Sequence, residues 1–157
     1  MIGVDPGLSV TGFAILKKKG PDIRSICYGV IRPPAGRPLP LRLKHLHDEL
    51  LTIMQTYQPD SLAIEDTFYQ KNIRSAIALG QARGTLLVAG ANYGIPCSEY
   101  APRKIKQAVV GNGAATKEQV QFMVQRILTL SEPPKPLDAS DALAIGICHF
   151  HHLGNIK

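Results

Sequence analysis

The sequence predicts an α/β protein in which a mixed sheet, three antiparallel strands and then parallel strands, carries helices on both faces. Three short apolar runs separated by turn residues come first, and they favour an antiparallel meander. After them, segments with helical spacing alternate with short apolar runs, which is typical of layered α/β domains. We expect a single domain over 1–157, without a linker or internal repeat.

The composition indicates an ordinary soluble protein. Hydrophobic residues make up 45% of the chain, but no apolar run approaches the roughly 18 residues of a membrane span, and no signal peptide is evident. We therefore expect a cytoplasmic protein without a membrane partner. Cys27, Cys97 and Cys148 fit reduced core thiols better than disulfides or a zinc site. The net charge of +6 suits a polyanionic partner but does not by itself identify nucleic acid.

The first three strands are bounded by turn residues. A buried-looking strand over 1–5 ends in Asp5, and a Pro-Gly turn leads to an apolar strand over 11–16. A third strand is expected over 23–31, after a solvated, lysine-rich hairpin tip at 17–21. Asp5 therefore lies at the end of a strand.

A helix and a fourth strand follow. Apolar residues recur at helical spacing over 41–57, after a Pro- and Gly-rich loop. Residues 61–64 form a short apolar run of the kind expected for a strand buried on both faces, and this run ends in Glu65. A second acidic residue is thus expected at a strand end.

The helix expected over 72–93 is crowded with alanine and glycine. Glycine inside a helix costs up to about 1 kcal/mol relative to alanine, so several glycines indicate close approach of another backbone. We favour an approach inside the domain, and an approach across a dimer interface is the alternative. Three of the glycines are Gly80, Gly84 and Gly90.

The remainder of the chain predicts one more strand and then helices. The strand spans 97–101, and Pro102 suits the first position of a helix. Residues 116–119 fit a capping box that opens the next helix. A proline-rich approach leads to the last helix, whose first turn is expected to hold both Asp138 and Asp141.

Four acidic residues at the ends of elements form the candidate catalytic site. Asp5 and Glu65 each end an apolar strand, although acidic side chains are seldom buried without compensation. If the last helix packs on that sheet edge, Asp138 and Asp141 join them, and repulsion raises pKa values unless a cation is bound. Oxygen ligands suit Mg²⁺ or Mn²⁺, and two ions would serve phosphodiester cleavage. Helix capping and turn formation remain alternative roles for each acid.

Basic and aromatic residues supply candidate contacts to nucleic acid. Positive charge at a helix N-terminus opposes the macrodipole, and phosphate binding is one reason to keep it there. An aromatic side chain after Glu65 suits stacking on an unpaired base, although Phe68 would also fit the core. The histidines at 149–152 suit a capping or surface role, with His149 able to reach the edge of the site. The candidate DNA-binding residues are Phe68, Tyr69, Lys71, Arg74, Arg103, Lys104, Lys106 and Lys117.

Several of these motifs resemble the RuvC family of bacterial Holliday junction resolvases, within the ribonuclease H-like superfamily. The resemblance covers nearly the whole chain and implies a ribonuclease H-like fold. An Asp-x-Gly turn is shared more widely, whereas the Gly-Gln-Ala-Arg-Gly run and the basic run after Tyr100 are more specific. The matching segments are 2–7, 63–65, 79–84, 100–107 and 138–144.

The resemblance also implies a function. Family members are homodimers that bind a four-way DNA junction and nick two strands of like polarity, using divalent metal, in recombination and DNA repair. A branch-migration complex of the RuvA and RuvB type is the implied partner. Phe68 matches the aromatic that stacks on the junction, and Lys106 and Lys117 match basic residues near the scissile phosphate. The implied catalytic acids are Asp5, Glu65, Asp138 and Asp141.

Other functions remain open from the residues alone. An actin-like kinase or ATPase also begins with a strand, an Asp-x-Gly turn and a second strand, but that fold normally needs two such domains. A catalytically silent junction-recognition module would need the basic helix starts and Phe68 but not the acids. A related nuclease acting on RNA or simple duplex is the nearest alternative.

Overall fold

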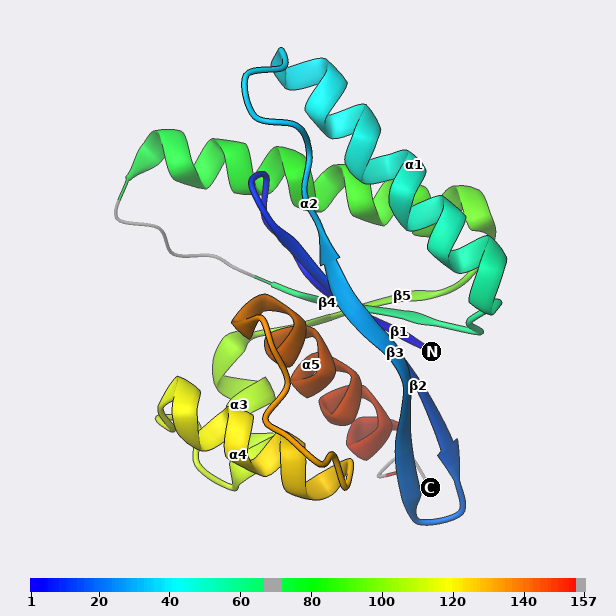
Figure 1. The fold of residues 1–157 in the computed structure, drawn as a ribbon, viewed down its shortest axis with the longest axis vertical. Helices are drawn as coiled ribbons and strands as arrows, with labels where there is room; N and C mark the ends of the chain where they lie inside the picture. Colours follow the sequence, from blue (N-terminus) through cyan, green and yellow to red (C-terminus); the bar gives the residue numbers. More distant parts are fainter. Residues whose placement is uncertain (67–71, 155–157) are drawn as a thin grey trace.

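The computed structural model describes residues 1–66 and 72–154, which form a five-stranded sheet between two layers of helices (Figure 1). The strand order is β3-β2-β1-β4-β5. β1, β2 and β3 pair antiparallel, whereas β1, β4 and β5 run parallel, so the predicted mixed sheet is confirmed. The strands are β1 (Ile2–Asp5), β2 (Thr11–Lys19), β3 (Asp22–Ile31), β4 (Leu62–Glu65) and β5 (Cys97–Tyr100).

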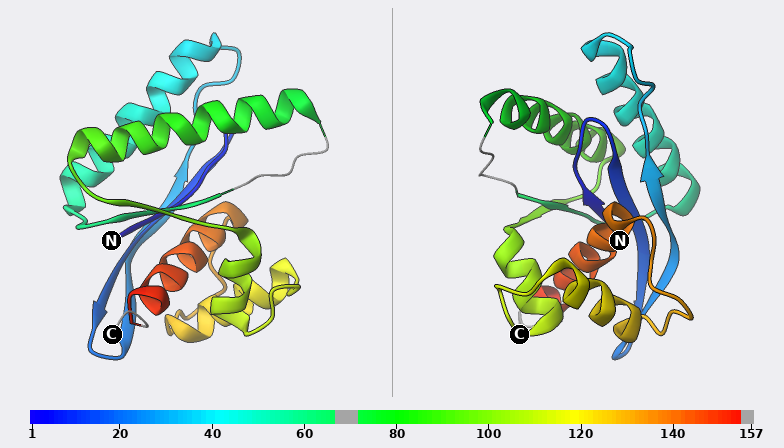
Figure 2. Two further views of the ribbon diagram at one scale, coloured as in Figure 1. Left: turned by 180° about the vertical axis from the view of Figure 1, so that it is seen from behind. Right: turned by 60° about the vertical axis from the view of Figure 1, so that its left-hand side comes forward.

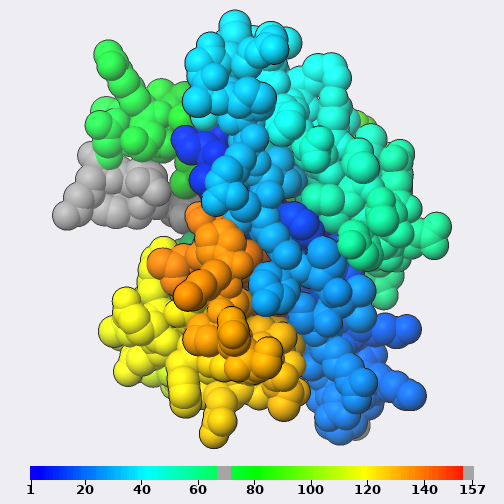
Figure 3. Space-filling view, viewed as in Figure 1, coloured from blue at the N-terminus to red at the C-terminus, as the bar shows by residue number. Residues whose placement is uncertain are grey.

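Helices cover both faces of the sheet, as predicted. Two of them pack on one face and three on the other, so that two separate hydrophobic layers form (Figure 2). In the space-filling view, α4 and the segment leading into α5 lie on the opposite side of the strands from α1 (Figure 3). The first face carries α1 (Leu39–Tyr57) and α2 (Ile73–Tyr93), and the second carries α3 (Pro102–Val110), α4 (Lys117–Ile127) and α5 (Leu137–Gly154). None of the helices within the described ranges is long and apolar enough to cross a membrane.

The strand alternation decides which way the acidic side chains face. Leu62 and Ile64 of β4 enter the hydrophobic layer under α1 and α2, whereas Ala63 enters the layer under α5. Glu65 therefore faces the α5 side. The same alternation in β1, which pairs with β4 in parallel, places Asp5 on that side and at the same sheet edge.

Two glycines let α5 lie against the centre of the sheet. A β-carbon on Gly3 would overlap the carbonyl oxygen of Ala142, and one on Gly12 would overlap the carbonyl oxygen of Asp138. Gly146 of α5 in turn leaves room for the side chain of Leu16. This close packing sets the depth at which the acids of α5 lie beside β1.

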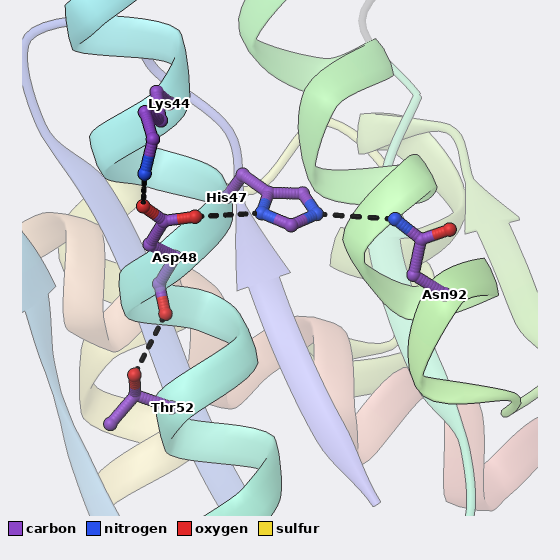
Figure 4. A network of polar contacts seen from close by, with 5 residues as sticks. All are labelled: Lys44, His47, Asp48, Thr52 and Asn92. Atoms are coloured by element: carbon purple, nitrogen blue, oxygen red, sulfur yellow. Dashed lines mark hydrogen bonds and ion pairs between the residues drawn. The ribbon is translucent and has the colours of Figure 1, made fainter.

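A polar network joins α1 to α2 at the surface (Figure 4). Nδ2 of Asn92 lies 3.3 Å from Nε2 of His47, and Nδ1 of the same ring lies 3.0 Å from the Asp48 carboxylate. Lys44 pairs with this carboxylate, and the hydroxyl of Thr52 donates to the Asp48 carbonyl at 2.8 Å. The two helices therefore form one layer.

The glycines of α2 have different surroundings. A β-carbon on Gly90 would meet the side chains of Leu62 and Cys97, so the close approach there is inside the domain, as favoured, but it is made by side chains and not by another backbone. The predicted close approach is wrong for Gly80 and Gly84, because, apart from neighbouring residues of α2 itself, no atom of the described chain lies within 4 Å of a β-carbon at either position. These two glycines face open space.

The bounds of several elements differ from prediction, mostly by one residue, and three differences are informative. The lysines at 17–19 were expected in a turn, but they pair with residues 22–24 and extend β2, because only Gly20-Pro21 is needed to reverse the chain. Helix α1 begins at Leu39 because proline is tolerated in a first turn. Helix α5 begins at Leu137, so Asp138 lies in its first turn and Asp141 in its second. The prediction that both acids lie in the first turn is wrong.

Candidate active site

Three of the four predicted acids line one pocket at the carboxyl ends of β1 and β4. The pocket has a volume of about 290 Å³, and residues of α3, α4 and α5 also line it. Basic side chains from α3 and α4 reach the same space. The lining residues are Asp5, Glu65, Pro102, Ile105, Lys106, Lys117, Val120, Asp141 and Ala144.

A tight turn fixes the chain immediately after Asp5. The buried hydroxyl of Thr11 donates to the Gly7 carbonyl at 2.7 Å and accepts from the Gly7 amide at 3.2 Å. Nη2 of Arg42 donates to the carbonyl of Leu8 at 3.0 Å, which ties the same turn to α1. The backbone that carries Asp5 is therefore held from both sides.

Helix α4 places Lys117 opposite the acids. The Thr116 hydroxyl accepts from the amide of Gln119 at 3.3 Å, and Oε1 of Gln119 accepts from the Thr116 amide at 2.9 Å. This confirms the predicted capping box. Nζ of Lys117, the first residue of the helix, lies 3.4 Å from Oδ2 of Asp141. The ammonium thus offsets part of the negative charge in the pocket.

Burial and repulsion raise the pKa values of the pocket acids. Burial is the main cause at Asp5, and repulsion from Glu65 and then Asp141 adds to it, raising its pKa to about 8. Burial, followed by repulsion from Asp141, raises the pKa of Glu65 to about 7. Burial also raises the pKa of Asp141, although Lys117 opposes this effect. A cation among these groups would favour the ionised form of each carboxyl.

Asp138 lies beside the pocket without lining it. Its carboxylate is near enough to contribute to the raised pKa values of Asp5 and Asp141. The structure thus brings all four predicted acids to one region, three of them into the pocket itself. Within residues 1–66 and 72–154, no three acidic, histidine or cysteine side chains already form a closed metal-binding group. The acids surround a space rather than meeting at one point.

The predicted DNA-binding residues have different positions. Lys106 and Lys117 line the pocket. Lys104 points away from it, over the Tyr100 ring at 5.2 Å, and lines a separate groove of about 530 Å³. Arg103 and Arg74 are exposed at the starts of α3 and α2. Phe68, Tyr69 and Lys71 lie outside the described residues.

His149 is a core residue, contrary to the expected surface or capping role. It is 2% exposed, and its Nδ1 lies 2.9 Å from the hydroxyl of Tyr100. It does not line the pocket. His151 and His152 lie in the last turns of α5, where imidazoles suit the helix dipole as expected. Cys148 is a buried free thiol, as predicted, whereas Cys27 and Cys97 are free but half-buried.

The apolar wall of the pocket was not predicted. Ile105, Val120 and Ala144 come from three helices, and they exclude water from one side of Asp5 and Glu65. Helical spacing marks such residues as buried but does not indicate what they are buried against. Arg83 was also missed, although it contacts Asp66, the residue directly after Glu65.

Comparisons with known sequences identify related proteins. The model of one family, described as crossover junction endodeoxyribonuclease RuvC, matches residues 1–149. The RuvC of Desulforamulus reducens is 48% identical over 149 residues, which is 95% of this chain and 91% of the relative. The RuvC of Syntrophomonas wolfei is 46% identical over 151 residues, which is 96% of this chain and 88% of the relative.

Solved structures confirm the predicted ribonuclease H-like fold. Thermus thermophilus RuvC has a TM-score of 0.87 at 33% identity, covering 98% of this chain and 97% of that one. The same protein in complex with a Holliday junction substrate has a TM-score of 0.90 at 33% identity, covering 98% and 96%. The yeast mitochondrial resolvase Ydc2, with a TM-score of 0.65 at 12% identity over 94% and 77%, shares the fold.

Proposed function

The chain belongs to the RuvC family of crossover junction endodeoxyribonucleases, and we propose that it resolves four-way (Holliday) DNA junctions. It hydrolyses one phosphodiester bond in each of two strands of like polarity. The observation that carries the assignment of the site is the pocket at the ends of β1 and β4, where half-buried acids face Lys106 and Lys117. The proposed catalytic residues are Asp5, Glu65, Asp138 and Asp141.

Two divalent ions, Mg²⁺ or Mn²⁺, fit the residues of this pocket. The donors are carboxylate oxygens, which hard cations prefer. Desolvation and repulsion hold the pKa of Asp5 near 8, so its ionised carboxylate is disfavoured in the metal-free pocket and would be favoured by a bound cation. Asp5 would hold both ions, Glu65 one of them, and Asp138 with Asp141 the other. Bound there, the ions would activate a water molecule and stabilise the leaving oxygen.

Lys117 and Lys106 would hold the DNA phosphate. The ammonium of Lys117 now pairs with Asp141 at 3.4 Å. With Asp141 holding an ion, that ammonium would be free to donate to a phosphate oxygen instead. Lys106 reaches the same pocket from α3. Phe68, Tyr69, Lys71, Arg74, Arg103 and Lys104 remain proposed contacts to the junction outside the pocket.

We propose that a homodimer forms through α2. Ile73, Ile77 and Val88 are exposed on this helix at intervals that place them, with Gly80 and Gly84, along one helical face. The open space at both glycines supports close packing of a second α2 there. A self-complementary face of this kind suits two-fold symmetry, which a junction with two like strands requires. A branch-migration complex of the RuvA and RuvB type is the further partner that family membership suggests.

The function is tested with a labelled immobile four-way junction, a DNA duplex and an RNA hairpin, each with Mg²⁺, Mn²⁺ or EDTA. We expect paired nicks in the junction only, and none in EDTA. Asp5→Asn should bind the junction and leave it intact, whereas the control Asp22→Asn, at the exposed hairpin, should nick normally.

Other outcomes would assign another function. Equal cleavage of duplex or RNA would indicate a different nuclease. Junction binding without nicking by the unaltered protein would indicate a recognition module, and ATP turnover without DNA would indicate a kinase-like enzyme. Metal-dependent nicking by Asp5→Asn would contradict the assignment of the acids.

A further inference from the structure

An ion-pair network lies behind the pocket, on the opposite face of the sheet. Nη2 of Arg83, from α2, lies 3.1 Å from Oδ1 of Asp66 and also pairs with Glu99 of β5. The side chains of Arg83 and Asp66 are only 24% and 19% exposed, so water screens their attraction less than at a free surface. One guanidinium therefore joins two neighbouring strands.

Strand alternation places this network directly behind Glu65. Ile64 enters the hydrophobic layer under α2, so Asp66 faces the same way and Glu65 faces the pocket. On β5, Cys97 packs against that layer and Glu99 follows it on the same face. The guanidinium thus lies on one face of the strand end whose other face presents the catalytic carboxylate.

At its end, β4 pairs with β5 through Glu65 and Tyr100, whereas its pairing with β1 stops one residue earlier, at Ile64. The last backbone hydrogen bond between this end and β5 runs from the Asp66 amide to the Tyr100 carbonyl, at 2.9 Å. The strand ends at Glu65, and the contact with Arg83 is made one residue later. Without the guanidinium, Asp66 and Glu99 would repel each other across adjacent strands.

The position of α2 is fixed independently at the far end of the same strands. Gly90 packs on Leu62 and Cys97, where β4 and β5 begin. Arg83 lies seven residues earlier, so it is on the same face of the helix, about two turns away. The helix therefore spans β4 and β5 and presents Arg83 at the catalytic edge.

We propose that Arg83 is a positioning residue that holds the end of β4 so that the Glu65 carboxylate points into the pocket. This inference rests on the proposed nuclease function, in which Glu65 binds a metal ion. The guanidinium pairs with two carboxylates, offsets part of their charge and fixes the spacing of the strand ends that carry them. Lysine would supply the charge without the planar fork, so it would replace arginine only in part.

The test measures single-turnover nicking of an immobile four-way junction by Arg83→Gln at saturating protein, over a range of Mg²⁺ concentrations. We expect the rate to fall about tenfold or more, because small displacements of catalytic groups have large effects. The Mg²⁺ concentration for half-maximal rate should rise several-fold, while junction affinity in EDTA stays unchanged. Arg83→Lys should be intermediate. Arg37→Gln, in an exposed loop, is the charge-matched control and should behave as the unaltered protein.

Two results would overturn the inference. One is an unchanged rate and Mg²⁺ dependence in Arg83→Gln, and the other is a lost rate explained wholly by weaker junction binding. If Arg83→Gln does not fold, Asp66→Asn removes one of the two pairs, and an unchanged Mg²⁺ dependence there would overturn the inference as well. Failure of the unaltered protein to nick would instead reject the proposed function.

Discussion

Asp5 is the carboxyl group whose surroundings differ most from water. It ends a strand that lies between two hydrophobic layers, and Glu65, Asp141 and Asp138 all oppose its ionisation. Its pKa is about 8 in the folded protein against 3.8 for an ordinary aspartate. Between these two pH values the folded state keeps a proton that the unfolded chain has lost. The metal-free protein therefore loses stability as pH rises through that window.

Asp5→Asn should stabilise the metal-free protein at high pH. The amide cannot ionise, so it avoids the cost of a buried charge that grows from pH 4 to pH 8. Thermal unfolding in EDTA should show a midpoint several degrees above that of the unaltered protein at pH 9, and a much smaller difference at pH 4. Asp22→Asn, at the exposed hairpin, is the control. An equal midpoint difference at both pH values would contradict this explanation.

Elements with strong local signals were predictable from the sequence. The capping box at Thr116, the proline at the start of α3 and the αL glycine that ends it, Gly111, all act within a few residues of the chain. The length of β2 depends instead on pairing with β3 through Asp22, which local propensity does not encode. The ends of elements are therefore less predictable than their existence.

The residues of the candidate site also fall into those that local sequence signals predict and those that only tertiary packing brings together. Asp5 and Glu65 were predictable because acids that end apolar strands are conspicuous, and Lys117 because it follows a cap. The apolar wall of the pocket and the contacts of Arg83 arise only when α2, α3, α4 and α5 pack on the sheet. Gly12 gave no clear signal either, since its function is to admit the backbone of Asp138.

Gly3→Ala should separate α5 from the sheet. The added methyl group would overlap the carbonyl oxygen of Ala142, and a backbone atom cannot relieve the overlap by changing rotamer as a side chain can. We expect a loss of about 1–3 kcal/mol in the free energy of unfolding, measured by urea denaturation in EDTA. Junction nicking should fall too, because Asp141 moves with its helix. Gly29→Ala is the matched control, since its methyl group would meet only the Phe13 ring. Equal stability of the two variants would refute the argument.

At the scale of the whole molecule, the sheet separates two surfaces. Helices α3, α4 and α5 lie on one side of it and α2 on the other (Figure 2). The acids and Lys117 belong to the first side, and the exposed apolar residues of α2 belong to the second. Arg83 lies between them, because it belongs to α2 and contacts the residue after Glu65. A partner bound on α2 would therefore be connected through one helix to the sheet edge that carries the proposed active site.

Ile77→Glu should convert the proposed dimer into a monomer. The side chain is 57% exposed on the apolar face of α2, so a charge there would be buried without a partner in the interface. Sedimentation velocity should show the loss of a species of twice the monomer mass, while the thermal midpoint of the monomer is little changed. The two strands of a junction should no longer be nicked together, because simultaneous incision needs two pockets on one junction. Ile26→Glu, at a residue 56% exposed on β3, is the matched control and should remain dimeric. If both variants sediment as the unaltered protein does, the interface lies elsewhere.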